Sequence, residues 1–377
     1  MCGPMCTPTM STPDRSLVGW DVGGAHLKAC LMQRGQVVDV AQWACPLWQG
    51  LEHLEQALQD AHQRWPDLSA AAHAVTMTGE MVDLFADRED GVQRIAQHLS
   101  QFLRPANPAA LQFFAGDAGW CGLPGVARHW NHIASANWLA SVRHAALSFE
   151  QGVVIDIGST TTDLIAFKDG RVASSSRTDA QRLATGELVY QGVVRTPLCA
   201  LAQRISWQGA QLNVMNEFFA TVADVYRLTG ELDAAHDLYP SADNAPKDPL
   251  ATRRRLARMI GLDERDGAPE EWLAFAHAWR THQVVELGGQ LRRVMEAHEL
   301  SPDATIVSAG CGDFLIDDVV AQAVATEAQA RPAIRPYGMD VARVSANALG
   351  GQAAAARWAQ VCAPSVAVAA LLDREQY

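Results

Sequence analysis

Two acidic glycine loops, 135 residues apart, carry the side chains of this sequence best suited to chemistry. Asp21 begins the first loop and is followed by Gly23 and Gly24, while Asp156 and Gly158 hold the matching positions of the second. Each loop follows an apolar run typical of a strand, so it would place backbone N–H groups, which bind anions, beside a carboxylate, which binds Mg²⁺. The second loop continues with three hydroxyl side chains, Ser159, Thr160 and Thr161.

One loop of this kind is weak evidence, because an aspartate at the end of a strand is usually a solvated turn residue. Two copies in register within one chain indicate that both loops belong to one functional site. Facing each other across a cleft, the loops would hold a di- or triphosphate, with Mg²⁺ on Asp21 and Asp156.

Two basic side chains follow the first loop. Lys28 lies seven residues after Asp21, and on a strand that begins near His26 it would share a face with that histidine. Lys28 could then reach a phosphate oxygen as a point charge, or it is an exposed strand lysine. His26 is either a general base or a polar loop residue.

Four further segments contain candidate site residues. Glu80 follows a predicted strand and, with Asp83, could act in acid–base chemistry or bind an amine; the alternative is a surface turn. Asp117 lies in a second acidic glycine turn that would flank the cleft. Ser135 and Asn137 interrupt an apolar helical run, where they would hydrogen-bond to a substrate or satisfy buried backbone groups. The strand-to-helix turn at residues 308–313 contains Gly310 and Gly312 and would allow close approach of a nucleoside or another flat group.

An internal repeat predicts the architecture that positions these residues. Beyond the two acidic loops the register continues without a gap, so that Gly35 matches Gly170 in two predicted hairpin turns. We therefore expect an α/β protein with two duplicated domains around a central cleft. The first domain would span residues 17–150 and the second residues 151–362, between a flexible N-terminal segment at 1–16 and a C-terminal tail at 363–377. A helical insertion is expected at about 209–300, with helices at 212–228 and 272–299 and a mobile loop at 239–249. A strand at 341–345 and a helix at 347–362 would complete the second domain.

Composition excludes several functional classes. The 30 Lys and Arg residues against 42 Asp and Glu give a formal net charge of −12, which argues against a broad basic face for nucleic acid or anionic lipid. The eight scattered cysteines suggest neither a zinc site nor a disulfide framework. We find neither a signal peptide nor a membrane span and expect a cytoplasmic protein. The oligomeric state is left open.

The motifs together resemble a known group of proteins. The two loops and the turn at 308–313 are similar to the actin, sugar-kinase and Hsp70-like superfamily, and residues 156–163 (DIGSTTTD) resemble its hydantoinase/oxoprolinase branch. Residues 20–28 (WDVGGAHLK), 76–85 (TMTGEMVDLF), 114–119 (FAGDAG) and 133–138 (IASANW) resemble the tetrahydromethanopterin-linked C1-transfer pathway proteins, which include the archaeal condensing enzyme of methanofuran biosynthesis. This resemblance spans about residues 17–360.

The resemblance implies a transferase with two substrates, a phosphorylated furan and a glutamylated phenol. It would join an aminomethyl-furanmethanol diphosphate to the phenol oxygen of a glutamyl-tyramine or tyrosine acceptor and release pyrophosphate, with Mg²⁺ but without ATP. By the same resemblance Glu80 or His26 is the candidate base, and Asp83 or Asp117 would bind the aminomethyl group. The leaving diphosphate would be held by residues of both loops, namely Gly23, Gly24, Lys28, Gly158, Ser159, Thr160 and Thr161.

Two other functions use the same features. An ATP-dependent kinase, or an enzyme of the hydantoinase or oxoprolinase type, would hold nucleotide phosphates in the same loops. However, Ala25 stands where the usual kinase loop carries Thr or Ser, which lowers the case for ATP hydrolysis. A nucleotide-gated scaffold without catalysis is the second alternative.

Overall fold

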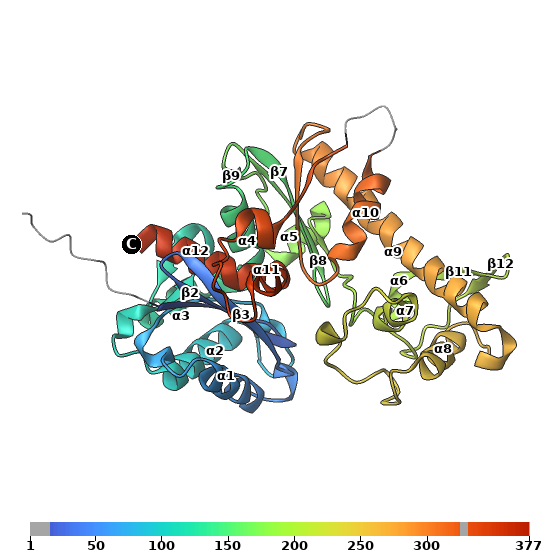
Figure 1. Cartoon of the computed structure of the whole chain (residues 1–377), viewed down its shortest axis with the longest axis horizontal. Coiled ribbons are helices and arrows are strands. Elements are labelled where there is room, and N and C mark those ends of the chain that lie inside the picture. The colour runs from blue at the N-terminus through green and yellow to red at the C-terminus, as the bar shows by residue number, and fades with distance from the viewer. Residues whose placement is uncertain (1–15, 325–330, 377) are drawn as a thin grey trace, which may run out of the picture.

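Two six-stranded sheets with the same internal order form the framework of the molecule (Figure 1). The computed structural model describes residues 16–324 and 331–376, so the expected flexible segment at 1–16 lies outside the described residues except for Ser16. The order β3-β2-β1-β4-β5 in the first sheet corresponds to β9-β8-β7-β13-β14 in the second. In both sheets the first three strands are antiparallel and the other two are parallel to the central strand. The predicted duplication is therefore present in the topology.

The strands begin and end close to the predicted turns. The first sheet consists of β1 (Ser16–Val22), β2 (His26–Gln33), β3 (Gln36–Ala44), β4 (Ala72–Met77), β5 (Leu111–Phe114) and β6 (Trp120–Cys121). The second consists of β7 (Gln151–Ile157), β8 (Thr162–Lys168), β9 (Arg171–Val172), β10 (Leu188–Val189), β13 (Thr305–Ala309) and β14 (Ile334–Pro336). Arg34 and Gly35 join β2 to β3 with φ of 51° and 69°, and Asp169 and Gly170 join β8 to β9 with φ of 55° and 69°. Both predicted hairpins thus have the left-handed turn residues that the twist of paired strands requires.

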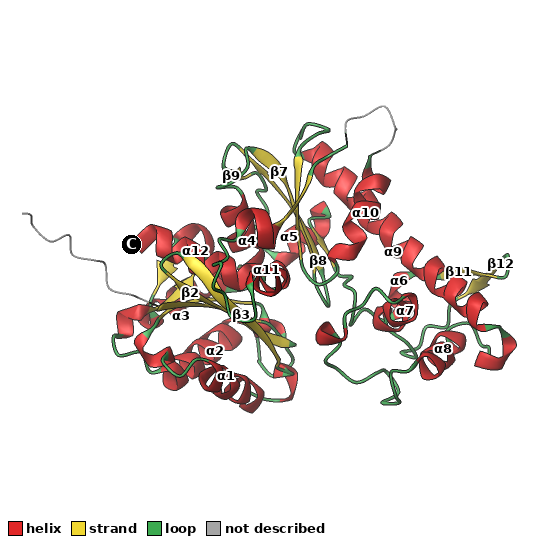
Figure 2. Ribbon diagram, in the orientation of Figure 1, coloured by secondary structure: helices red, strands yellow, loops and turns green. Residues whose placement is uncertain are grey.

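Helices cover both faces of the first sheet (Figure 2). On one face Val18, Trp20 and Val22 join a core with the apolar sides of α1 (Glu52–Arg64) and α2 (Arg88–Leu103). On the other face Leu17 belongs to the core shared with α4 (Asn137–Ala145) and α12 (Ala363–Gln376). Alternate residues of one strand therefore enter two different cores, as the two-residue period of a strand dictates.

The expected C-terminal tail is instead the helix α12, which packs on β1, β2 and β4 of the first domain. In Figure 1 it lies across the strands that are coloured blue at the other end of the chain. The approach is so close that a Cβ atom at Gly19 would lie 1.9 Å from the carbonyl oxygen of Ser365. The prediction was wrong because a short apolar helix needs a distant surface to pack on, and the order of residues alone does not reveal that surface.

The insertion of the second domain is a helical lobe with a small hairpin, and its buried side chains join the core of the second sheet. It contains α6 (Leu198–Leu201), β11 (Arg204–Trp207), β12 (Ala210–Asn213), α7 (Val222–Thr229), α8 (Pro249–Arg258) and the long α9 (Pro269–Ala297). The helix predicted at 212–228 begins only at Val222. Residues 212 and 213 belong to the hairpin, whose turn residues Gln208 and Gly209 have left-handed φ of 47° and 81°, and residues 214–221 are not helical.

The end of the second domain also differs from the prediction. Residues 337–341 form a π-helical turn, and Val344 makes only an isolated bridge to Val37, because β14 already occupies the sheet beside β13. The predicted strand at 341–345 is thus wrong. Helix α11 (Gln352–Val361) begins five residues later than predicted, after Gly350 and Gly351 with φ of 74° and 95°. The remaining helices are α3 (Val126–Ile133), α5 (Asp179–Thr185) and α10 (Ile316–Ala323).

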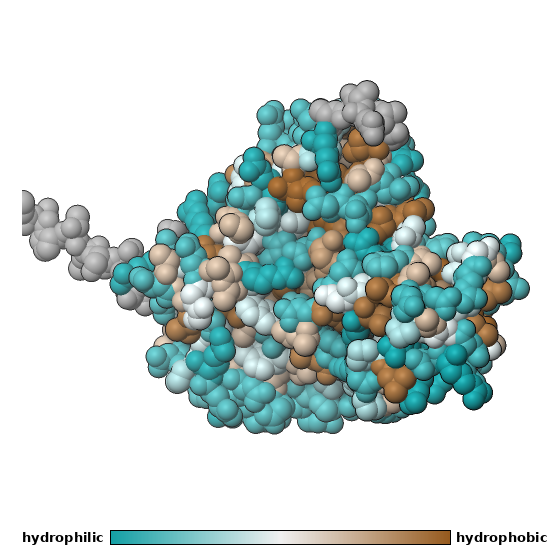
Figure 3. All heavy atoms as spheres, turned by 45° about the vertical axis from the view of Figure 1, so that its right-hand side comes forward, coloured by the Kyte–Doolittle hydropathy of each residue, from teal (hydrophilic) through white to brown (hydrophobic). Residues whose placement is uncertain are grey.

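The face shown in Figure 3 is mostly hydrophilic, with apolar side chains in smaller patches between polar ones. Across residues 16–324 and 331–376, no single helix has the length and apolar character of a membrane span. Helices α11 and α12 pass that test only as a pair, by length and composition, and they are bent by 99° to each other.

Candidate active site

A cleft of about 620 Å³ lies where the two acidic loops meet, and it brings together most of the predicted site residues. From the first half of the chain and its junction with the second come Asp21, Gly23, Gly24, His26, Lys28, Asp83, Ser135 and Asn137. From the second half come Asp156, Gly158, Ser159, Thr160 and Thr161. Residues of two elements far apart in the chain therefore line one cleft, as predicted.

The two loops have the same turn geometry. The amide of Gly23 donates to the carbonyl oxygen of His26 at 2.9 Å, and the amide of Gly158 donates to that of Thr161 at 2.8 Å. These two glycine amides close their turns, so they are not the groups open to an anion. The amides that follow each glycine, and the hydroxyls of Ser159 and Thr160, are the donors that the loops offer to the cleft.

Two buried carboxylates and one ammonium lie between the loops. Burial raises the pKa of Asp21 to about 6 and that of Asp156 to about 7, although Lys28 acts in the opposite direction on both. Burial alone would lower the pKa of Lys28, but its acidic neighbours outweigh burial and raise it. The Lys28 ammonium also donates to the carbonyl oxygen of Val361 at 3.2 Å. Lys28 thus faces the cleft and also compensates the negative charge of the two aspartates.

The carboxylate of Asp21 fits a cation. Its Oδ1 atom is buried without a hydrogen-bond partner. A divalent ion between Asp21 and Asp156 would satisfy this oxygen and would favour the ionised form of both groups. Among the residues that the structure describes, no three His, Cys, Asp or Glu side chains form a metal-binding group, so an ion here would need ligands from a substrate or water.

Glu80 lies one layer behind the wall of the cleft and connects to it through Ser135. The Ser135 hydroxyl is 2.8 Å from Oε1 of Glu80 and 3.1 Å from Oδ2 of Asp179. A hydroxyl has one proton, so Ser135 can donate to only one of these two carboxylates at a time, and its bond to Glu80 is the shorter one. Burial, opposed by the Ser135 hydrogen bond, raises the pKa of Glu80 to about 7.

The backbone explains how Ser135 reaches both partners. The predicted continuous helix is broken here, since α3 ends at Ile133 and α4 begins at Asn137. Ser135 occupies the break with a φ of 52°, which is unusual for a residue with a side chain. The break turns the hydroxyl away from a helix surface and into the wall between the two domains.

His26 is buried at the floor of the cleft, with its ring 5.4 Å from that of Tyr239. Burial, assisted by the positive charges of Lys28 and Arg195, lowers its pKa to about 3. The imidazole is therefore neutral and a much weaker base than Glu80. Between the two predicted bases, the structure favours Glu80.

Four predicted site residues do not line the cleft: Glu80, which lies behind Ser135, and Asp117, Gly310 and Gly312. Asp117 forms ion pairs with Arg143 and, at 2.5 Å, with Arg177, so its carboxylate is occupied. The turn that contains Gly310 and Gly312 is covered by α11, from which Gln360 donates to the hydroxyl of Ser308. A flat ligand cannot approach this turn as predicted, because protein side chains already fill the space.

Sequence reasoning missed a second set of cleft residues. Asp179 and Arg182 form ion pairs with each other at 2.6 Å, and Arg88 joins Asp179 at 2.6 Å from the first domain. Arg182 also pairs with Asp163, which takes the place of Lys28 in the second repeat. Trp48 and Arg195 line the cleft as well, as does Tyr190. The register of the repeat could have identified Asp163, but the others lie in segments without a motif.

Comparison with known proteins agrees with these observations. Residues 71–351 match the hydantoinase/oxoprolinase family. The chain is 24% identical to the (4-{4-[2-(γ-L-glutamylamino)ethyl]phenoxymethyl}furan-2-yl)methanamine synthase of Methanocaldococcus jannaschii, in an alignment that covers 81% of this chain and 88% of the archaeal protein. It is 28% identical to the synthase of the same name from Methanococcus vannielii, over 45% of this chain and 75% of that protein.

The fold is also found in solved structures. A nucleotide-free structure of acetone carboxylase aligns with this chain at 10% sequence identity and a TM-score of 0.50. The alignment covers 83% of this chain and 68% of the acetone carboxylase chain. With the duplicated sheets and the cleft between them, the predicted actin, sugar-kinase and Hsp70-like fold is confirmed. Since the family match extends over more than half of its residues, the chain belongs to the hydantoinase/oxoprolinase family.

Proposed function

We propose that this protein forms an aryl ether in the biosynthesis of a methanofuran-type cofactor. The phenol oxygen of a glutamylated tyramine or tyrosine attacks the methylene carbon of an aminomethyl-furanmethanol diphosphate, and pyrophosphate leaves. The names of the two archaeal relatives support this reaction, because the product that they state contains a phenoxymethyl group on a furan with a methanamine substituent.

One structural observation carries the proposal. A single cleft combines two anion-binding loops, which suit a diphosphate, with a carboxylate of pKa about 7 that reaches the same space through a hydroxyl. The proposed reaction needs both groups in one place, because the loops would bind the leaving diphosphate while the carboxylate accepts the proton of the phenol.

The reaction balances as a substitution at carbon. The bond between the furfuryl carbon and the diphosphate oxygen breaks with its electron pair on oxygen, and the phenol oxygen forms the new bond. The furan oxygen can stabilise positive charge on that carbon while the leaving group departs. In our proposal the donors of the two loops and Lys28 would face the diphosphate, where negative charge develops, and fixed donors at such a place accelerate a reaction most.

The phenol must lose its proton during attack. Its ordinary pKa of about 10 exceeds that of Glu80, so the proton moves readily only as the new bond forms. In our proposal Glu80 is ionised before the reaction, which its pKa of about 7 allows near neutral pH. The phenol gives its proton to the Ser135 hydroxyl as the proton of that hydroxyl moves to the Glu80 carboxylate. Asp179 orients Ser135 and is held by two arginines, Arg88 and Arg182.

Mg²⁺ is part of the proposal. Asp21 and Asp156 would hold it, with diphosphate oxygens and water as the other ligands. When bound it would neutralise charge on the diphosphate. Asp83, which lines the cleft, is the candidate to bind the aminomethyl group, since Asp117 is occupied by two arginines.

The decisive test mixes purified protein and Mg²⁺ with the furan diphosphate and each acceptor, with and without ATP. Pyrophosphate and the mass of the ether are followed together. We expect both products in equal amounts without ATP. A folded protein that forms neither product but hydrolyses ATP in the presence of an acceptor would support the ATP-dependent alternative and refute the proposal.

A further inference from the structure

Arg195 follows β10 and lies half-buried at the wall of the cleft, where aromatic rings rather than acidic side chains surround its charged group. The guanidinium carbon is 4.8 Å from the ring centre of Trp48 and 5.9 Å from that of Tyr239. The two ring centres are 5.6 Å apart, so the rings lie beside each other and not on opposite sides of the guanidinium. The two rings therefore do not enclose the guanidinium between them.

The other cations of the cleft are already compensated. Arg182 pairs with Asp163 and Asp179, and Lys28 lies in the field of Asp21 and Asp156. Within the described part of the chain, the Arg195 guanidinium forms neither an ion pair nor a hydrogen bond; its contacts are the two cation–π pairs. A cleft with this many acidic groups, in a chain of net charge −12, thus keeps one arginine free of carboxylates.

The position of Arg195 indicates what it binds. Its backbone amide donates to the carbonyl oxygen of Ser159 at 2.8 Å, which ties it to the second acidic loop. Trp48 is tied to the first loop, because the amide of the preceding Leu47 donates to the carbonyl oxygen of Gly24 at 3.0 Å. The guanidinium thus lies where both loops would present their donors to an anion.

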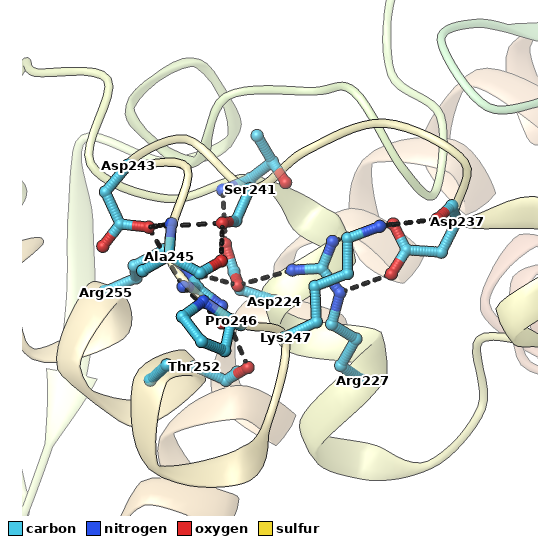
Figure 4. A network of polar contacts seen from close by, with 12 residues as sticks. Asp224, Arg227, Asp237, Ser241, Asp243, Ala245, Pro246, Lys247, Thr252 and Arg255 are labelled. Carbon is cyan, nitrogen blue, oxygen red and sulfur yellow. Dashed lines mark hydrogen bonds and ion pairs between the residues drawn. The ribbon is translucent and has the colours of Figure 1, made fainter.

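Tyr239, which lies in the insertion, contacts Arg195 together with Trp48. Tyr239 donates its hydroxyl to the carbonyl oxygen of Ala25, next to the first loop. The loop around Tyr239 is fixed by the ionic network of Figure 4, in which Asp237 binds Arg227 and Lys247. On the other side of Tyr239, the buried Arg255 binds Asp224 and Asp243. The loop expected to be mobile is therefore held by ion pairs at both ends.

We propose that Arg195 is a specificity-determining residue that binds the diphosphate of the furan substrate, while Trp48 and Tyr239 hold its guanidinium flat against the junction of the two domains. A planar fork of N–H groups matches two phosphate oxygens, and stacking on aromatic rings keeps the fork oriented. A substrate carboxylate offers the same oxygen geometry, so the test must separate the two anions. Identification of the anion as the leaving diphosphate rests on the proposed function.

The test measures binding by calorimetry for two probes in the presence of Mg²⁺: inorganic pyrophosphate, which lacks carboxylates, and γ-glutamyl-tyramine, which lacks phosphate. Arg195→Gln should weaken pyrophosphate binding by roughly 10- to 100-fold, as expected for lost hydrogen bonds between charged groups, and leave acceptor binding within about twofold. Arg195→Lys keeps the charge but loses the planar fork of N–H groups. Its pyrophosphate affinity should therefore lie between those of the natural protein and Arg195→Gln. Arg254→Gln, at an exposed position on α8, is the matched control and should bind both probes as the natural protein does.

Each other outcome overturns the assignment. Unchanged pyrophosphate affinity in a folded Arg195→Gln variant excludes a role in diphosphate binding, and selective loss of acceptor binding assigns Arg195 to a carboxylate instead. Equal loss for both probes indicates a structural role. Ether formation by the natural protein is scored separately, so failure of the proposed function would be seen as absent turnover even where pyrophosphate binding depends on Arg195.

Discussion

Replacing Glu80 with glutamine should lower activity and raise stability at alkaline pH, because the same buried carboxylate is proposed to accept a proton and is costly to ionise. Glu80 is 1% exposed, and burial raises its pKa from an ordinary value of 4.5 to about 7. At about 1.4 kcal/mol for each pKa unit, this difference corresponds to about 3 kcal/mol. Glutamine preserves the shape and never ionises.

The sign of the effect follows from linkage. A raised pKa means that the folded protein binds the Glu80 proton more tightly than the unfolded chain. The resulting stability is fully present below pH 4.5 and is lost as the pH rises through about 7. The free energy of unfolding of Glu80→Gln, relative to that of the natural protein, should therefore rise by about 2 to 3 kcal/mol when the pH is raised from roughly 5 to 8.5.

The assay is denaturant unfolding at these two pH values, with turnover measured on the same preparations. Glu286→Gln, in an exposed position on α9, is the matched control and should change neither quantity. A stability difference for Glu80→Gln that does not depend on pH would refute the assignment of a raised pKa. Full turnover in the folded variant would refute its role as the base.

Three other substitutions test separate parts of the structure. Asp156→Asn should abolish ether formation while the fold, followed by circular dichroism, is retained, because this buried carboxylate is proposed to hold the metal ion; normal turnover would contradict the metal site. Gly310→Ala should lower the melting temperature, since its Cβ would lie 2.2 Å from the carbonyl oxygen of Ile157 at a φ of +86°, and an unchanged melting temperature would contradict this close packing. Arg255→Ala removes one of the two arginines that bind the buried Asp224, together with the buried partner of Asp243, and should make the insertion more sensitive to limited proteolysis. Resistance equal to that of the natural protein would show that the network does not stabilise the insertion.

Much of the site was predictable because it lies on a repeated local pattern. The strand, acidic loop and hairpin depend on neighbouring residues, so Asp21 and Asp156 could be aligned from the sequence alone. Residues outside the repeat were harder to place. Asp117 lies in the same kind of glycine turn, but its carboxylate forms ion pairs with Arg143 and Arg177, which lie at distant positions in the chain.

The sequence by itself determined the duplicated α/β domains, the two loops and the hairpins, since each follows from apolar periodicity and turn residues within a few positions. Only the tertiary structure decided which chain segments meet. It placed α12 on the first sheet, buried Glu80 behind Ser135, and set Arg195 against Trp48 and Tyr239. The physical reason is that burial and charge compensation depend on neighbours from all parts of the chain, which local sequence patterns do not specify.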